Sequence, residues 1–339
     1  MGCVGVRRKH GGGEGYRVLD LFCGAGGLSL GFLQEGFSVT GVDISEKAEK
    51  SFTFNLNSGS RFIRADLLTV NITGEYDVVV GGPPCRPWAS VNTVKRGRAH
   101  RDHVLLSRYF EHVTRLRPGV FLMENVPALG GDPSFREYIA RMERVGYSVE
   151  VGVVRYSDYG APTSRRRLIA FGALGLDASG FFRELGKHRR PPRTVRDAIA
   201  HLRGQPRGAE PDHEWPTLRT IGKYKGLYET GRYGWYILKW DRPAPSFGNV
   251  MKTYILHPDS AVGDRGGGEE QEEGDGDGDG GSPHPRVISV REALHIMGFP
   301  EEYKFPQVGL GARYQMVADA VSPVFSKVAA QAVTRLLHE

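Results

Sequence analysis

Residues 17–28, Arg-Val-Leu-Asp-Leu-Phe-Cys-Gly-Ala-Gly-Gly-Leu, decide the fold of this chain. An apolar run ends in a glycine-rich turn, and a helical pattern follows over residues 28–35. Such a turn between a strand and a helix lets backbone N–H groups approach a ligand closely. Its glycines are bunched at Gly24, Gly26 and Gly27, whereas dinucleotide-binding turns space them as Gly-x-Gly-x-x-Gly. The turn therefore indicates a ligand site without identifying the ligand.

Two further predicted strands end in acids. Residues 37–43 end in Asp43, about 20 residues beyond the turn, where a Rossmann-like fold presents a carboxylate to ribose hydroxyls. Residues 61–66 end in Asp66, and the first strand carries Asp20. Singly, each acid is an ordinary strand-end residue. Together they predict a nucleoside pocket at the carboxyl edge of a parallel sheet.

A cysteine follows two prolines at residues 81–85, Gly-Gly-Pro-Pro-Cys, directly after the apolar run 76–80. Each proline ring locks φ and restricts the residue before it, so the backbone fixes the direction of Cys85. A thiol held in this way can serve as a nucleophile where cationic groups or a helix N-terminus favour the thiolate. The alternative for Cys85 is a buried structural cysteine.

The ordered set of short motifs resembles the C5-cytosine DNA methyltransferases, from about residue 16 to residue 337. The motifs are Asp-Leu-Phe-Cys-Gly-Ala-Gly-Gly at 20–27, Gly-Val-Asp at 41–43, Ala-Asp at 65–66, Gly-Gly-Pro-Pro-Cys at 81–85, Glu-Asn-Val at 124–126, Tyr-Gly-Ala-Pro at 159–162 with Arg165 and Arg167, and Arg-Glu at 291–292 with Gly-Phe-Pro at 298–300.

Alternating strands and helices predict an α/β fold. The resemblance implies a Rossmann-like class I methyltransferase fold, with a mostly parallel sheet, helices on both faces and a smaller target recognition lobe. The expected parts are a flexible basic, glycine-rich tail at 1–15, a catalytic and cofactor-binding domain at 16–172, a target recognition domain at 173–284 with an acidic, glycine-rich disordered insert at about 261–284, and a return to the catalytic domain at 285–339. We expect residues 314–337 to form one helix whose start packs beside the cofactor turn. Most aromatic residues of the recognition stretch are expected in its core, among basic side chains suited to DNA.

The resemblance implies methyl transfer from S-adenosylmethionine to C5 of a flipped-out cytosine in double-stranded DNA. Cys85 would form a covalent adduct at C6 of the cytosine, and a desolvated Glu124 would donate to N3. Arg165 and Arg167 should share one face of a strand, the first reaching the base and the second orienting its surroundings. The implied cofactor-binding residues are Asp20, Phe22, Gly24, Gly26, Gly27, Asp43, Ile44, Asp66, Leu67, Pro84 and Ala320.

Several positions depart from the family's pattern. Thr163 stands where glutamine is usual, Arg86 replaces the glutamine after the cysteine, and His295 and Met297 replace arginine and glutamine. Asp319 replaces an asparagine, and its charge is expected to weaken cofactor binding. Residues 86–103 are basic and contain Trp88, a composition suited to a loop that closes on DNA.

The composition of the 339 residues fits a polyanionic partner, because the formal net charge is +6 and the pI is about 9.2. Three cysteines without paired spacing predict neither a zinc site nor a disulfide framework. The chain lacks an apolar stretch of ~18 residues, so we expect a soluble, cytoplasmic monomer without a membrane partner.

Three functions remain open from the sequence. The first is a sequence-specific DNA methyltransferase, compatible with a cognate restriction endonuclease that acts separately. The second is a tRNA cytosine-C5 methyltransferase of the same fold. The third is a nucleic-acid-binding protein without turnover, suggested by the departures from the pattern.

Overall fold

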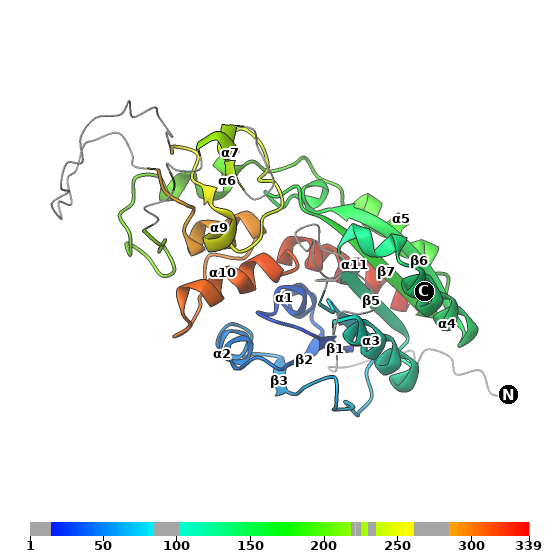
Figure 1. Cartoon of the computed structure of the whole chain (residues 1–339). Helices are drawn as coiled ribbons and strands as arrows, with labels where there is room; N and C mark the ends of the chain where they lie inside the picture. The colour runs from blue at the N-terminus through cyan, green and yellow to red at the C-terminus, as the bar shows by residue number, and fades with distance from the viewer. Residues whose placement is uncertain are drawn as a thin grey trace, which may run out of the picture.

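A seven-stranded sheet forms the centre of the molecule, in the order β3-β2-β1-β4-β5-β7-β6 (Figure 1). The computed structural model describes residues 15–84, 102–217, 221, 225–229, 235–260 and 285–338. The strands are β1 (Arg17–Leu21), β2 (Ser38–Asp43), β3 (Ser60–Arg64), β4 (Val78–Gly81), β5 (Val120–Asn125), β6 (Tyr147–Arg155) and β7 (Arg166–Leu174). All neighbours are parallel except that β7 is antiparallel to both β5 and β6. The predicted α/β class with a mostly parallel sheet is confirmed.

Helices cover both faces of this sheet, because alternate strand residues point to opposite sides. Val18 and Val80 pack with one set of helices, whereas Leu19 and Val79 pack with the other. The first set comprises α1 (Gly27–Gln34), α2 (Glu46–Asn55), α5 (Ser179–Lys187) and α11 (Pro323–His338); the second comprises α3 (Asp102–Leu116) and α4 (Pro133–Arg144). The sheet is therefore buried between two apolar layers, and its carboxyl edge is left to the loops.

Helix α1 closely approaches α11 and the residues just before it at two glycines. A Cβ added at Gly27 would lie 2.3 Å from the carbonyl oxygen of Val321, and one added at Gly31 would lie 2.3 Å from the backbone nitrogen of Lys327. The Ser326 hydroxyl donates to the carbonyl of Leu28 at the same contact. The absence of side chains at the glycines therefore lets the end of the chain pack directly beside the first turn.

The prediction of one helix over residues 314–337 is wrong. The chain forms α10 (Leu310–Asp319), then leaves helical geometry at Ala320, and α11 starts at Pro323. Proline lacks the N–H needed in a helix interior and disfavours helical geometry in the residue before it, so Pro323 can begin a helix but not continue one. The Tyr16 hydroxyl donates to the carbonyl of Leu337, which joins the chain's end to its start.

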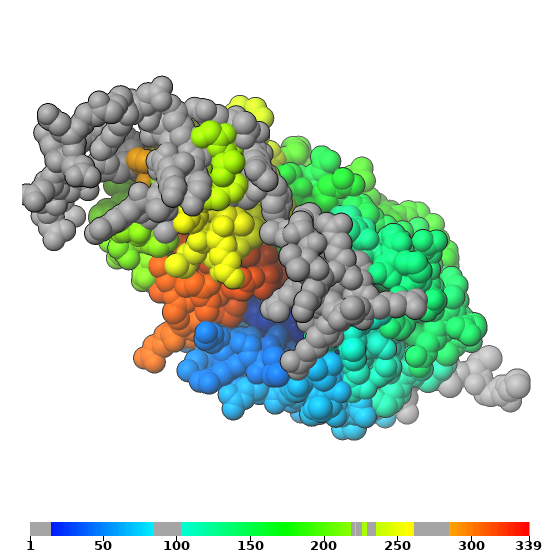
Figure 2. All heavy atoms as spheres, viewed as in Figure 1, coloured from blue at the N-terminus to red at the C-terminus, as the bar shows by residue number. Residues whose placement is uncertain are grey.

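Seven further elements form a smaller lobe beyond α10 (Figures 1 and 2). They are α6 (Val195–Ile199), η4 (Ala200–Leu202), α7 (Lys225–Glu229), β8 (Tyr236–Ile237), α8 (Val250–Thr253), β9 (Ile255–Leu256) and α9 (Val290–Met297). Tyr228 is buried, and Trp215, Trp235, Tyr236 and Trp240 pack against the core, so the described aromatic residues lie where they were predicted. Tyr224 and Tyr233 lie outside the described residues.

Helix α5 falls within the stretch expected to form the recognition lobe, yet it packs against the central sheet. Its Phe181 stacks on Phe171 of β7 with ring centroids 4.2 Å apart. The chain therefore leaves the sheet only after Lys187. The predicted tail and acidic insert lie almost wholly outside the described residues.

A methyl group at the contact between α1 and α11 should destabilise the fold. We expect Gly31→Ala to lower the free energy of unfolding by about 1–3 kcal/mol, since the backbone of Lys327 cannot move away easily. Urea denaturation followed by circular dichroism measures this change. Gly186→Ala in α5 is the matched control: its Cβ would meet nothing within 4 Å, so its stability should stay equal or rise. Equal loss in both variants would contradict the close-packing account.

Candidate active site

The glycine turn is tied to the end of β2 through Asp43. The Asp43 carboxylate accepts hydrogen bonds from the backbone N–H of Gly24, at 3.0 Å, and of Ser45, at 2.9 Å. Phe22 and Gly24 adopt left-handed backbone geometry, with φ of 61° and 53°. Phe22 is the unusual member of this pair, because left-handed geometry costs a residue with a side chain more than it costs glycine. The two strand ends therefore form one ordered unit at the carboxyl edge of the sheet.

Asp20 lies below this turn and supports it from within. Its side chain is 1% exposed and accepts a hydrogen bond of 2.6 Å from the Ser29 hydroxyl. Burial raises the pKa of Asp20 to about 7. The hydrogen bond from Ser29 stabilises the carboxylate and acts in the opposite direction, but its effect is smaller. Burial also raises the pKa of Asp43, and the charge of Asp319 adds to the shift. Asp319 thus lies close enough to the predicted ribose-binding acid to affect it.

The other predicted cofactor residues surround the turn in different ways. Ile44 has an apolar side chain that is 62% exposed, although it directly follows the buried β2. Asp66 accepts from the backbone N–H of Leu68 at 2.9 Å, and Leu67 is buried. Ala320 lies against Gly27: a Cβ added at Gly27 would be 3.4 Å from the Cβ of Ala320. Gly26 has a positive φ of 82° and caps α1, and Pro84 is half-buried.

Glu124, at the end of β5, is buried and engaged by two donors. Its Oε1 atom accepts from Arg167 Nε at 2.8 Å and from the Tyr156 hydroxyl at 3.0 Å. Its Oε2 atom lies on the side of Gly82, 3.5 Å from where a Cβ would be. The next residue, Asn125, donates through Nδ2 to the carbonyl of Pro83 at 3.0 Å. The end of β5 is thereby fastened to the segment that leads into Cys85.

Arg165 and Arg167 share one side of their strand, as predicted, because both are buried while Arg166 is exposed. Arg165 Nη1 donates to the carbonyl of Phe247 at 3.4 Å, but its buried Nε atom has no hydrogen-bond partner among the described residues. Burial, together with the adjacent charge of Arg167, lowers the pKa of Arg165 to about 10. A buried guanidinium with a free donor is suited to a polar ligand.

Thr163, the departure from glutamine, joins the two lobes. Its hydroxyl donates to the carbonyl of Ala244 at 3.2 Å, and the backbone N–H of Ser164 donates to the same oxygen at 2.8 Å. The Ala244 N–H in turn donates to the carbonyl of Pro162 at 2.9 Å. This part of the chain holds the smaller lobe beside the arginines even without an amide side chain.

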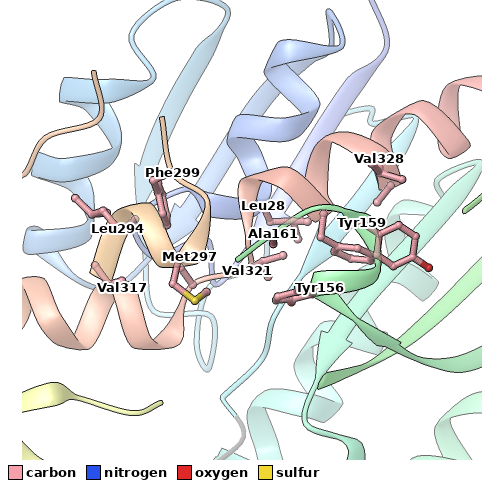
Figure 3. Close-up of a cluster of buried hydrophobic side chains, with 14 of the residues drawn as sticks. Leu28, Tyr156, Tyr159, Ala161, Leu294, Met297, Phe299, Val317, Val321 and Val328 are labelled. Atoms are coloured by element: carbon pink, nitrogen blue, oxygen red, sulfur yellow. The ribbon is translucent and has the colours of Figure 1, made fainter. Parts of the chain in front are cut away.

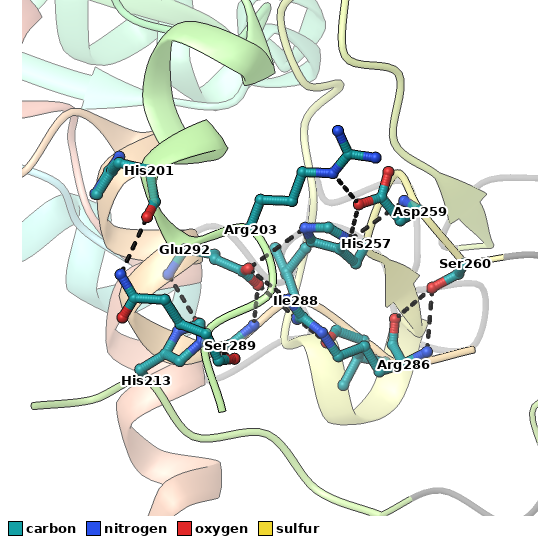
Figure 4. A network of polar contacts seen from close by, with 12 residues as sticks. His201, Arg203, His213, His257, Asp259, Ser260, Arg286, Ile288, Ser289 and Glu292 are labelled. Carbon is teal, nitrogen blue, oxygen red and sulfur yellow. Dashed lines mark hydrogen bonds and ion pairs between the residues drawn. The ribbon is translucent and has the colours of Figure 1, made fainter. Parts of the chain in front are cut away.

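The Arg291–Glu292 motif is structural. Arg286 donates to both oxygens of the buried Glu292 carboxylate, at 2.8 and 2.7 Å, and Glu292 also caps α9 through Ser289 (Figure 4). Burial would raise the pKa of Glu292, but the Arg286 guanidinium holds it below its usual range. The guanidinium of Arg291 donates to three backbone carbonyls, those of Pro211, Glu301 and Tyr303.

Two further departures lie on α9. Met297 is fully buried in the apolar cluster that also contains Tyr156 and Val321 (Figure 3). The Nε2 atom of His295 is buried without a hydrogen-bond partner among the described residues. Burial is the main cause that lowers the pKa of His295 to about 4, so this side chain is neutral at pH 7.

Two predictions fall outside the described residues. The structure describes the chain as far as Pro84 and again from residue 102, so the predicted nucleophile Cys85 and nearly all of the predicted closing loop at 86–103 are not placed. One residue in contact with the predicted site was not predicted from the sequence. Tyr156 reaches Glu124, and the only sequence signal was an aromatic residue three positions ahead of the Tyr159-Gly160 motif.

Comparison with known proteins identifies the family. The model of the C-5 cytosine-specific DNA methylases matches residues 16–335. The chain belongs to this family. This methylase is 28% identical to the Type II methyltransferase M.MthTI of Methanothermobacter thermautotrophicus, over 90% of the chain and 92% of that protein. It is 27% identical to the Type II methylase M.HgiDII of Herpetosiphon aurantiacus, over 95% and 96% of the two chains.

Solved structures agree in fold. The Entamoeba histolytica methyltransferase EhMeth superposes with a TM-score of 0.67 at 15% identity, covering 96% of this chain and 100% of that one. Schizosaccharomyces pombe Dnmt2 gives 0.65 at 16% identity, covering 95% and 98%. The class I methyltransferase fold predicted from the sequence is confirmed.

The methylase therefore acts on cytosine C5 in DNA with a methyl donor. In the part of the chain that the structure describes, no three His, Cys, Asp or Glu side chains are grouped to hold a metal ion. None of the helices placed there is both long and apolar enough to cross a membrane.

The buried carboxyl of Asp20 should make stability depend on pH. Its pKa is about 7 in the folded protein and 3.8 for an ordinary aspartate. The folded state therefore binds the proton more tightly than the unfolded state does. The resulting gain in the free energy of unfolding is complete below pH ~4 and is lost as the pH rises through ~7. In the wild type, this group should lower the free energy of unfolding by a few kcal/mol between pH 4 and 8. The Asp20→Asn variant lacks the titrating carboxyl and should not show this decrease. Urea denaturation across this range measures it; identical pH dependence in wild type and variant would contradict the assignment.

Proposed function

We propose that this methylase transfers a methyl group from S-adenosylmethionine to C5 of a cytosine flipped out of double-stranded DNA, through a transient bond between Cys85 Sγ and C6. One observation carries the proposal. The buried Glu124 carboxylate lies beside Gly82, and its neighbour Asn125 bonds to Pro83, just ahead of Cys85. The acid therefore lies next to the segment that leads into the proposed nucleophile, which supports a shared role for the two groups.

The chemistry explains why both groups are required. C5 of cytosine is a poor nucleophile until a thiolate adds to C6, which breaks the aromaticity and makes C5 an enamine carbon. Electron density then moves toward N3, where the Glu124 carboxyl donates its proton or a hydrogen bond. Loss of the C5 hydrogen as a proton and departure of Sγ from C6 afterwards restore the aromatic ring and free Cys85.

Arg165 and Arg167 take different parts in this scheme. Arg167 bonds directly to Glu124 and holds that carboxyl in place. Arg165 does not contact Glu124 by a hydrogen bond, and its free Nε atom is available to an oxygen of the extruded base. Cytosine carries such an acceptor at O2. In this proposal Arg165 contacts the base and Arg167 positions Glu124, which are the roles that the family resemblance implies.

The glycine turn fits the proposed cofactor. Asp43 offers carboxylate oxygens at the strand end, Ile44 presents an exposed apolar surface for an adenine ring, and Ala320 closes the turn from the other side. Phe22, Asp66 and Leu67 complete the surroundings, with Pro84 toward the reaction centre. When bound, S-adenosylmethionine supplies an electrophilic methyl carbon. Asp319 adds a negative charge near Asp43, and we expect Asp319→Asn to bind the cofactor more tightly.

The smaller lobe supplies the DNA-reading surface in this proposal, and the positive net charge favours the polyanion. Extrusion of the base costs a few kcal/mol, which contacts to the backbone must offset. The relatives M.MthTI and M.HgiDII are named Type II enzymes. We therefore propose a monomeric, sequence-specific enzyme of a restriction-modification system, whose endonuclease acts separately. Transfer to tRNA is not favoured, because the matching family model is that of DNA methylases.

Labelled S-adenosylmethionine tests the acceptor and the nucleophile together. Purified protein should place label in duplex DNA and none in tRNA, and bisulfite sequencing should locate the modified cytosine. Cys85→Ala should abolish transfer, since no other thiol can replace the attacking sulfur. Cys3→Ala, in the predicted tail, is the matched control and should retain wild-type activity. Label in tRNA alone supports the tRNA methyltransferase, and label in neither acceptor supports binding without turnover; both results reject the proposal.

A further inference from the structure

The two donors that hold Glu124 converge on one of its oxygens. Arg167 Nε is 2.8 Å from Oε1, and the Tyr156 hydroxyl is 3.0 Å from the same atom. Among the described residues, none donates a hydrogen bond to Oε2, which lies on the side of Gly82. The two oxygens of this buried carboxyl are therefore not equivalent.

This asymmetry decides where a proton can sit. The Oε1 atom uses both of its lone pairs to accept hydrogen bonds from a guanidinium and a hydroxyl. A proton bound to Oε1 would therefore be repelled by the hydrogens of these two donors. The proton of a neutral Glu124 must then lie on Oε2. That oxygen is also the one on the side of Gly82, in the segment that leads into the proposed nucleophile.

We propose that Tyr156 is a positioning residue that fixes Oε1 and so reserves Oε2 of Glu124 for hydrogen bonding to N3 of the cytosine. This inference rests on the function proposed above. Arg167 alone cannot give the same result, because a guanidinium fork can engage either or both oxygens of a carboxylate. A second donor from another direction, restricted to Oε1, prevents the carboxyl from turning.

The surroundings of Tyr156 suit a fixed donor. The side chain is fully buried in η3 (Tyr156–Tyr159), and its ring stacks on Phe325 of α11 with centroids 5.0 Å apart and planes at 24° (Figure 3). Burial, and then the charge of Glu124, raise the pKa of this hydroxyl well above its usual range. It therefore keeps its proton, and the packed ring points that proton at Glu124.

A neighbouring tyrosine provides a matched control. Tyr159 belongs to the same turn, is also buried, and contacts the same Phe325 ring at 5.5 Å. Figure 3 shows its hydroxyl pointing away from Tyr156. Removing either hydroxyl leaves a phenylalanine against Phe325, but only Tyr156→Phe takes a donor from Glu124.

The test compares Tyr156→Phe and Tyr159→Phe in steady-state methylation of duplex DNA. We expect Tyr156→Phe to lower kcat about tenfold, the effect of losing one hydrogen bond to a charged group, with KM for DNA and for S-adenosylmethionine within about twofold of wild type. Tyr159→Phe should match wild type in all three. Rates are divided by the concentration of sites that bind S-adenosylmethionine, measured by titration, so partial unfolding does not imitate a loss of kcat.

A second readout isolates activation of the ring from methyl transfer. With DNA tritiated at cytosine C5 and no methyl donor, thiolate addition followed by protonation at C5 from water and reversal should release tritium to solvent. Tyr156→Phe should slow this release by the same factor as kcat. Equal kcat and equal tritium release in both variants would overturn the positioning role of Tyr156, as would a raised KM with unchanged kcat. In either case, an active wild type would still support the proposed function. A wild type inactive on DNA would reject the proposed function itself.

Discussion

A buried carboxyl group held by two donors is the constraint on which the rest of the structure depends. Placing Glu124 away from water is costly unless its oxygens are bonded, and the Arg167 and Tyr156 contacts provide that compensation. Because both contacts fall on one oxygen, they stabilise the group and orient it at the same time. The order of strands β4, β5 and β7 makes these contacts possible, since the proline segment, the acid and the arginines come from or adjoin three neighbouring strands.

The close packing of α1 and α11 on the same face of the sheet serves the same end. Phe325 of α11 supports the ring of Tyr156, and α11 is set against α1 by the glycines that follow the cofactor turn. The C-terminal helix thus connects the turn proposed to bind the methyl donor with the residue that orients the acid. The smaller lobe is joined to this unit at Ala244, which bonds to Thr163, and at the carbonyl of Phe247, which accepts from Arg165.

Much of this arrangement could be predicted from the sequence, for a physical reason. Strand ends, a glycine turn and an alternating pair of arginines are local patterns, so Asp43 beside the turn and the shared face of Arg165 and Arg167 followed directly. The Tyr156–Glu124 bond joins residues 32 positions apart in the chain, and no local pattern encodes it. The helix break at Pro323 was encoded locally but was overlooked in a long apolar pattern. Asp20 is buried against Ser29 in the first turn of α1, a contact that the strand pattern did not reveal.

The most direct test of the account is covalent trapping on a duplex that carries 5-fluorocytosine at the target site. The fluorine cannot leave as a cation, so the bond from sulfur to C6 should persist once the methyl group has been transferred. The account predicts a protein–DNA adduct stable to denaturation, with the nucleotide on the peptide that contains Cys85. Absence of an adduct, although DNA and S-adenosylmethionine are both shown to bind, would contradict it.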